Sequence, residues 1–104
     1  MQEITVQELK KKIDNKEDIQ LIDVREPHEH ELSNLGGELI PLSTILDNAG
    51  LISQDKPVII YCRSGARSAS AVNALERKLG YKNLFNLKGG IMTWAREIDP
   101  SIAV

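Results

Sequence analysis

The sequence predicts an α/β fold built around a mainly parallel sheet. Short apolar runs are typical of buried strands, and residues 57–61 are the clearest of them because the run is continuous and rich in β-branched residues. These runs alternate with segments such as residues 68–79, in which apolar side chains recur at helical spacing. Strands that alternate with helices favour a parallel sheet, and functional residues gather at the carboxyl ends of its strands.

Local signals place the individual elements. Thr5 and Glu8 have the spacing of a capping box at the start of the first helix. Pro27 suits the first position of the second helix, Ser43 could cap the third, and Gly80 suits the end of the fourth. Predicted helices cover residues 6–13, 26–32, 43–48, 68–79 and 91–98. Predicted strands cover residues 20–24, 39–41, 57–61 and 84–87.

Length and composition indicate one globular domain, predicted to span residues 1–104. Hydrophobic residues make up 41% of the chain and charged residues 27%, and the net charge is −2. Neither nucleic acid nor an anionic membrane is therefore an expected partner. No apolar run approaches the ~20 residues of a membrane span. The first residues lack the basic and apolar regions of a signal peptide, so the cytoplasm is the expected location.

Cys62 is the one cysteine of the chain and the leading candidate for a catalytic residue. It has no partner for an intramolecular disulfide and cannot build a thiolate zinc site alone. Any transfer chemistry at this thiol must therefore hand its product to another molecule. Cys62 follows the strand predicted at residues 57–61 and opens a loop that leads into the next predicted helix. This loop reads Cys62-Arg63-Ser64-Gly65-Ala66-Arg67.

Several features of this loop favour a reactive thiolate. A strand-to-helix loop can aim several backbone N–H groups at one point, and the helix that follows adds the positive end of its dipole. Gly65 permits a tight turn, and Arg63 and Arg67 add two permanent positive charges. These polar neighbours argue against an inert buried cysteine. The prediction is a nucleophilic Cys62 in an anion-binding loop over residues 62–67.

Four segments in this order resemble the rhodanese family: residues 21–26, 40–42, 62–67 and 88–94. The resemblance covers nearly the whole chain. It implies a five-stranded, mainly parallel sheet with helices on both faces. It also implies that Cys62 takes sulfur from thiosulfate or a persulfide and carries it as a persulfide cradled by the loop amides. A small thiol, cyanide or a sulfur-carrier protein would then accept the sulfur, with no cofactor beyond this covalent intermediate.

Loop length separates two related chemistries. Arg67 lies five positions after Cys62, which gives a Cys-x4-Arg pattern. Rhodanese-related phosphatases and arsenate reductases use Cys-x5-Arg, a wider cradle for a tetrahedral oxyanion, and Ser68 occupies that arginine's position here. The shorter loop favours sulfur transfer, and phosphatase-like or arsenate-reducing chemistry is the weaker alternative.

Residues 33–38 differ from the pattern of many rhodaneses, and this segment and the ending at residues 97–101 bear a further likeness. They are similar to rhodanese domains fused behind adenylating enzymes of the molybdopterin and thiamine sulfur pathways. This likeness implies an alternative function, a sulfur-relay or docking module that delivers sulfur to the adenylated C-terminus of a small carrier protein. The other interpretation is a general thiosulfate:thiol enzyme that shares these segments by descent.

Four residues outside the loop are candidate supporting residues. Asp23 and Arg25 follow a predicted strand and could orient a loop arginine or line the site, but a structural ion pair between loops is the favoured interpretation. Lys88 could attract an anionic donor or simply be exposed. Trp94 is expected in the core, the alternative being that its edge borders the pocket.

Two histidines and a run of lysines are expected at the surface. His28 and His30 lie in a polar helix and do not match His-Glu-x-x-His, so they are expected to be solvated and no metal site is predicted. The lysines at positions 10–12 are expected to form a solvated helix face.

Overall fold

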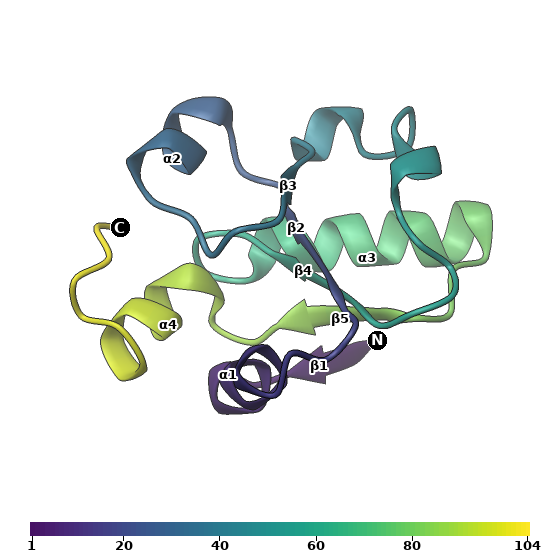
Figure 1. Ribbon diagram of the computed structural model, residues 1–104. Helices are drawn as coiled ribbons and strands as arrows, with labels where there is room; N and C mark the ends of the chain where they lie inside the picture. Colours follow the sequence, from purple (N-terminus) through teal and green to yellow (C-terminus); the bar gives the residue numbers. More distant parts are fainter.

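Five short parallel strands form one sheet at the centre of the molecule (Figure 1). The computed structural model describes residues 1–104. The strands are β1 (Gln2–Ile4), β2 (Gln20–Asp23), β3 (Glu38–Leu39), β4 (Val58–Tyr61) and β5 (Leu84–Leu87). They lie in the order β1-β5-β4-β2-β3, and every neighbouring pair is parallel. The predicted α/β class and five-stranded sheet are confirmed.

The edge strand β1 is the strand that no local signal predicted. It has three residues, and of their side chains only Ile4 is buried. Its place in the sheet comes from parallel pairing with β5, in which Ile4 lies opposite Leu87. Such a strand has no alternating or continuous apolar pattern of its own, because tertiary pairing decides its conformation.

Four α-helices cover the sheet: α1 (Val6–Asp14), α2 (Pro27–Leu32), α3 (Ala66–Leu79) and α4 (Gly90–Glu97). The predicted capping box of α1 is confirmed, because the Glu8 N–H donates to Thr5 Oγ1 at 3.1 Å and the Thr5 N–H donates to Glu8 Oε1 at 2.9 Å. None of the helices combines the length and the apolar character needed to span a membrane.

The helix predicted over residues 43–48 is wrong. Two short 3-10 turns, Leu42–Thr44 and Ala49–Leu51, stand there instead. Thr44 Oγ1 donates to Pro41 O at 3.0 Å, and Asn48 Nδ2 donates to Thr44 O at 3.1 Å. Local bonds of this kind from side chains to the backbone compete with the regular α-helical ladder.

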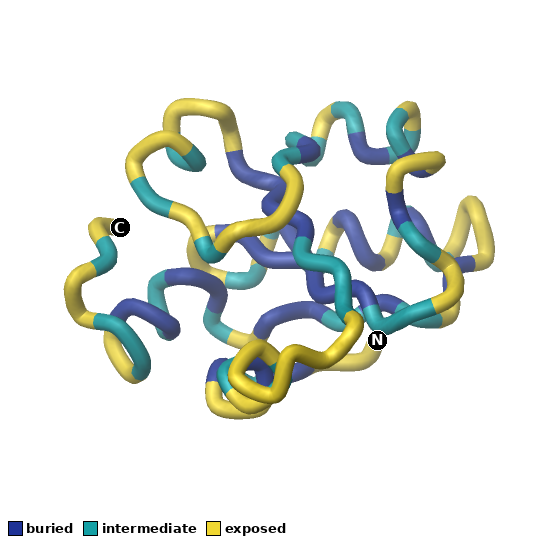
Figure 2. The backbone as a smooth tube through the Cα atoms, in the orientation of Figure 1, coloured by how far each residue is buried: buried dark blue, intermediate teal, exposed yellow.

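The helices cover both faces of the sheet, so successive side chains of β4 point into two separate cores (Figure 1). Ile60 packs with Leu75 in the core beneath α3. Ile59 packs with Leu9 and Trp94 in the core beneath α1 and α4. Figure 2 shows buried backbone concentrated in the central strands and in the helical segments that face them. Trp94 is 8% exposed, which confirms its expected place in the core.

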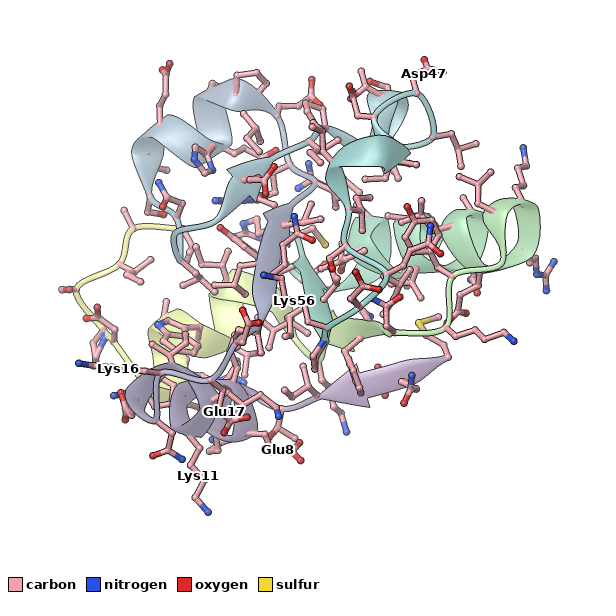
Figure 3. The ribbon with its side chains drawn as sticks, turned by 45° about the vertical axis from the view of Figure 1, so that its right-hand side comes forward. Glu8, Lys11, Lys16, Glu17, Asp47 and Lys56 are labelled. Carbon is pink, nitrogen blue, oxygen red and sulfur yellow. The ribbon has the colours of Figure 1, made fainter.

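The outer face of α1 carries the lysines at positions 10–12. Lys11 is exposed and projects away from the body of the molecule (Figure 3). Lys10 and Lys12 form ion pairs with Asp14 at 2.6 Å and Glu17 at 3.2 Å. The run is therefore the solvated helix face that the sequence predicted.

Candidate active site

Cys62 directly follows β4, at the carboxyl edge of the sheet, and its thiol is enclosed by the loop that leads to α3. The residue is 1% exposed. The backbone N–H groups of Gly65 and Ser68 point at Cys62 Sγ, with N···S distances of 3.1 Å and 3.4 Å. The Ser68 hydroxyl oxygen lies 3.3 Å from the same sulfur. Three polar groups from two residues, Gly65 and Ser68, thus converge on one sulfur atom.

This sulfur also takes the place of a helix cap. Gly65 immediately precedes α3 with a φ of +106°, a conformation that suits glycine, and it offers no side-chain acceptor to the first turn. Cys62 Sγ receives the Ser68 N–H instead. Free N–H groups and the dipole of a 14-residue helix favour negative charge at this end. The amino end of α3 therefore offers its N–H groups and its dipole to a negatively charged group held at Cys62 Sγ.

The start of α4 holds the Cys62 loop from behind. The Ile91 N–H donates to Cys62 O at 2.9 Å, and the Met92 N–H donates to Arg63 O at 3.0 Å. A Cβ atom on Gly90 would lie 2.5 Å from Cys62 O and closer still to Arg63 O. The Gly89-Gly90 pair is thus the tight entry into α4 that lets this helix approach the loop backbone.

Asn86 of β5 anchors the same loop from within the sheet. It is 4% exposed, and its Nδ2 donates to Gly65 O at 3.2 Å. Its Oδ1 is buried and has no hydrogen-bond partner in the protein. The Gly65 N–H points at Cys62 Sγ. The bond from Asn86 to the Gly65 carbonyl therefore also helps to orient this N–H group toward the sulfur. The one signal in the sequence was a polar residue inside an apolar strand.

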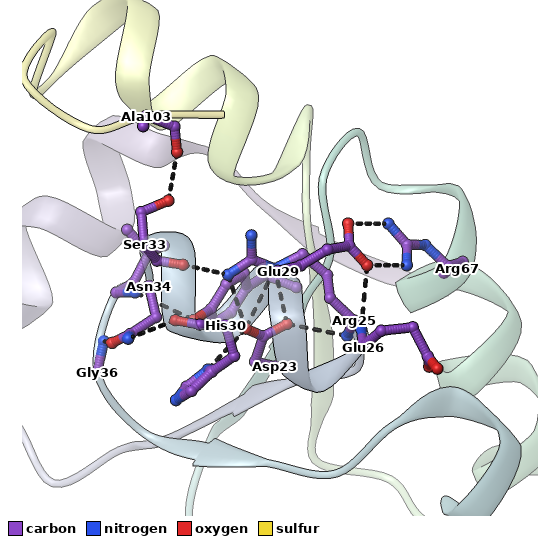
Figure 4. A network of polar contacts seen from close by, with 12 residues as sticks. Asp23, Arg25, Glu26, Glu29, His30, Ser33, Asn34, Gly36, Arg67 and Ala103 are labelled. Atoms are coloured by element: carbon purple, nitrogen blue, oxygen red, sulfur yellow. Dashed lines mark hydrogen bonds and ion pairs between the residues drawn. The ribbon is translucent and has the colours of Figure 1, made fainter.

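Arg67, in the first turn of α3, forms a two-point ion pair with Glu29 of α2 (Figure 4). Its Nη1 and Nη2 donate to the two carboxylate oxygens at 2.7 Å and 2.9 Å. This contact holds the pKa of Glu29 at about 2, below its usual value of 4.5, and raises the pKa of Arg67. Arg67 therefore does not present a free charge, and Glu29 is a site residue that sequence reasoning missed.

Asp23 and Arg25 form the structural ion pair that was expected. Arg25 Nη2 donates to Asp23 Oδ2 at 2.8 Å, and the two side chains are 3% and 0% exposed. Arg25 Nη2 also donates to Ser33 O at 2.6 Å, which ties β2 to the segment after α2. His30 Nδ1 lies 2.9 Å from Asp23 Oδ2. The expectation of a solvated His30 is wrong because α2 turns this side chain back toward β2, while His28 is exposed.

The remaining cationic candidates, Arg63 and Lys88, are exposed and form no ion pair. Lys88 lines a hollow with Thr5 and Arg96, beside the Gly89 turn rather than over the thiol. A larger hollow, which includes Lys56 in its wall, lies at the amino ends of β2 and β4. Ligands of parallel sheets bind at the carboxyl ends, which favours the Cys62 loop over this hollow.

Replacing Gly90 with alanine is expected to damage the loop. The variant should lose about 3 kcal/mol of unfolding free energy, because a left-handed residue gains a Cβ that collides with two loop carbonyls. Iodoacetamide should also modify Cys62 more slowly. Gly80→Ala is the matched control, since Gly80 has a φ of +73° with nothing within 4 Å of its Cβ position, and about 1 kcal/mol is expected. Urea unfolding and alkylation rates measure both, and equal losses would contradict this view of Gly90.

Comparison with known proteins identifies the class to which this fold and loop belong. The family model described as "Rhodanese-like domain" matches residues 5–97. A protein of Allochromatium vinosum named "Sulfurtransferase" is 38% identical over 102 residues, which cover 97% of this chain and 94% of that protein. The chain belongs to the rhodanese-like family of sulfurtransferases.

Two other relatives place the chain within this family. A rhodanese-like domain protein from Staphylococcus aureus has the same fold, with a TM-score of 0.82, 35% identity, and coverage of 90% of this chain and 91% of that one. The probable adenylyltransferase/sulfurtransferase MoeZ of Mycobacterium tuberculosis is 38% identical over 104 residues. That match covers 97% of this chain but 26% of MoeZ, so the chain spans only a part of this relative's length.

Proposed function

We propose that Cys62 is the nucleophile of a sulfur-transfer reaction and carries the sulfur as a persulfide. The observation that carries this proposal is the convergence of the Gly65 and Ser68 N–H groups on Cys62 Sγ at the start of α3. The thiolate attacks the outer sulfur of thiosulfate, a bond forms between the two sulfur atoms, and the S–S bond of thiosulfate breaks. Sulfite leaves with the electron pair of the broken bond, and the persulfide keeps one negative charge.

The second half of the reaction returns the thiolate. A nucleophilic acceptor attacks the outer sulfur of the persulfide, and Cys62 leaves as the thiolate that began the cycle. Because the chain has no second cysteine, this acceptor must be another molecule. A small thiol or cyanide meets the chemical requirement, and no cofactor other than the covalently held sulfur is needed.

The size of the cradle supports sulfur rather than phosphate as the group that is transferred. The position that would hold the arginine of a Cys-x5-Arg loop is occupied by Ser68, which is fully buried against Cys62 Sγ. Cys62 is itself 1% exposed, so the group that it carries must fit within the loop. One added sulfur atom occupies less space in the loop than a phosphate group.

A sulfur-carrier protein is the second candidate acceptor, and the similarity to MoeZ favours it. In this alternative, the persulfidated chain converts the adenylated C-terminus of the carrier to a thiocarboxylate. We expect isotopically labelled sulfane sulfur from thiosulfate to appear in the carrier when a cognate adenylating enzyme and ATP are present. The same mixture with the Cys62→Ala variant should leave the carrier unlabelled.

Mass spectrometry of the carrier measures this transfer, with a small thiol as the parallel acceptor. If the label passes to the thiol but never to the carrier, the relay function is wrong and the general thiosulfate:thiol activity stands. If the label passes to neither acceptor, Cys62 is not a sulfur donor under these conditions and the proposed function itself fails.

A further inference from the structure

Charged side chains of alternating sign lead from β2 to the Cys62 loop (Figure 4). Asp23 pairs with Arg25, and Glu29 pairs with Arg67. The two pairs also interact electrostatically, since Arg25 helps to lower the pKa of Glu29. Arg67 in turn is close enough to interact electrostatically with Cys62. The loop arginine nearest to this row is thus neutralised before any donor arrives.

Glu29 is held firmly in the position that neutralises Arg67. Its Oε1 accepts the Glu26 N–H at 3.0 Å, which makes it part of the capping box at the start of α2. Another residue of the same helix, His30, lies 2.9 Å from buried Asp23. With a pKa of about 2, Glu29 is ionised throughout the neutral range. An anionic donor therefore meets an Arg67 guanidinium that is already paired with a fixed carboxylate, whereas Arg63 forms no ion pair.

We infer that Glu29 sets the charge preference of the donor site, disfavouring small dianions such as thiosulfate and favouring donors of lower charge, such as persulfides. This inference rests on the proposed sulfur transfer at Cys62. Glu29 acts through Arg67 and does not touch the reacting sulfur, so it is a positioning residue. Its carboxylate accepts from both Nη atoms of Arg67, and its negative charge offsets the positive charge that would attract an anionic donor.

The charge of the donor gives this inference a quantitative signature. The repulsion energy between a carboxylate and a dianion is about twice that between the carboxylate and a monoanion at the same place, because Coulomb energy is proportional to charge. Removing the carboxylate should therefore change the affinity for the dianion by the square of the factor by which it changes the affinity for the monoanion. Added salt should shrink both effects, since part of the interaction passes through solvent.

The test compares two donors that deliver the same kind of sulfane sulfur, thiosulfate with two negative charges and methanethiosulfonate with one. In the Glu29→Gln variant, the KM for thiosulfate should fall about tenfold and the KM for methanethiosulfonate about threefold. The kcat should change by less than about twofold for both donors. Glu31→Gln is the matched control, because Glu31 is an exposed residue of the same helix without an ion pair, and its KM values should match those of wild type.

A variant and a binding measurement separate charge from structure. Glu29→Asp keeps the charge and should keep the KM for thiosulfate near the wild-type value. Equal KM changes for the two donors, or a loss of kcat without a change in KM, would overturn the inference.

Calorimetric binding of thiosulfate in the Cys62→Ser background needs no sulfur transfer, and Glu29→Gln should tighten it about tenfold. Tighter binding without turnover by wild type would reject the proposed function but keep this role of Glu29, whereas unchanged binding would reject the role.

Discussion

Replacing Cys62 with serine is expected to lower the rate of sulfur transfer at least ~1,000-fold while the protein stays folded. A serine hydroxyl can accept the same N–H groups of Gly65 and Ser68, so the loop should keep its shape. The hydroxyl remains protonated at neutral pH and is a poor carrier of sulfur. Thiocyanate formed from thiosulfate and cyanide measures the rate, and thermal unfolding checks the fold.

Ser70→Ala is the control for this variant, because Ser70 lies exposed on α3 outside the loop. Its rate should equal that of wild type. A Cys62→Ser variant that retains a rate within tenfold of wild type would place the nucleophile elsewhere in the protein.

Replacing Asp23 with alanine is expected to cost about 3–5 kcal/mol of unfolding free energy. The substitution leaves the Arg25 guanidinium buried without its counter-charge, and that side chain is only 3% exposed. It also removes the acceptor of the Arg25 backbone N–H and the contact with His30. A loss of this size is a large part of the total stability of a small domain.

Asp14→Ala is the matched control, since Asp14 forms an exposed ion pair with Lys10. Breaking that pair should cost only about 0.5 kcal/mol, because solvent already screens both charges. Urea unfolding of the two variants gives the comparison. Losses of similar size would mean that the buried pair contributes no more than a surface pair.

The parts of this molecule that sequence could predict are those written in local patterns. The run at residues 57–61, the capping box of Thr5 and Glu8, and the polar loop after Cys62 each carry their signal within a few neighbouring residues. Such signals are sufficient to give the α/β class and to single out the thiol. The spacing of Cys62 and Arg67 also favours the sulfur-transfer interpretation over the phosphatase alternative.

The features that sequence missed depend on contacts between distant segments. Glu29 and Arg67 are 38 positions apart in the chain, so no local sequence pattern near either residue predicts the ion pair. Asn86 reaches the Gly65 carbonyl from another strand, 21 positions away. The strand β1 exists because it pairs with β5, and Gly90 is required because α4 approaches the loop backbone. These positions surround the thiol that the sequence puts forward as the candidate nucleophile.

The mass of the intact protein after incubation with thiosulfate tests the central claim most directly. The account predicts that wild type gains the mass of one sulfur atom, that the added sulfur maps to the peptide containing Cys62, and that cyanide removes it. Cys62→Ser should gain nothing. Equal gains in both proteins, or no gain in wild type while the thiol remains reduced, would contradict the claim that Cys62 carries the transferred sulfur.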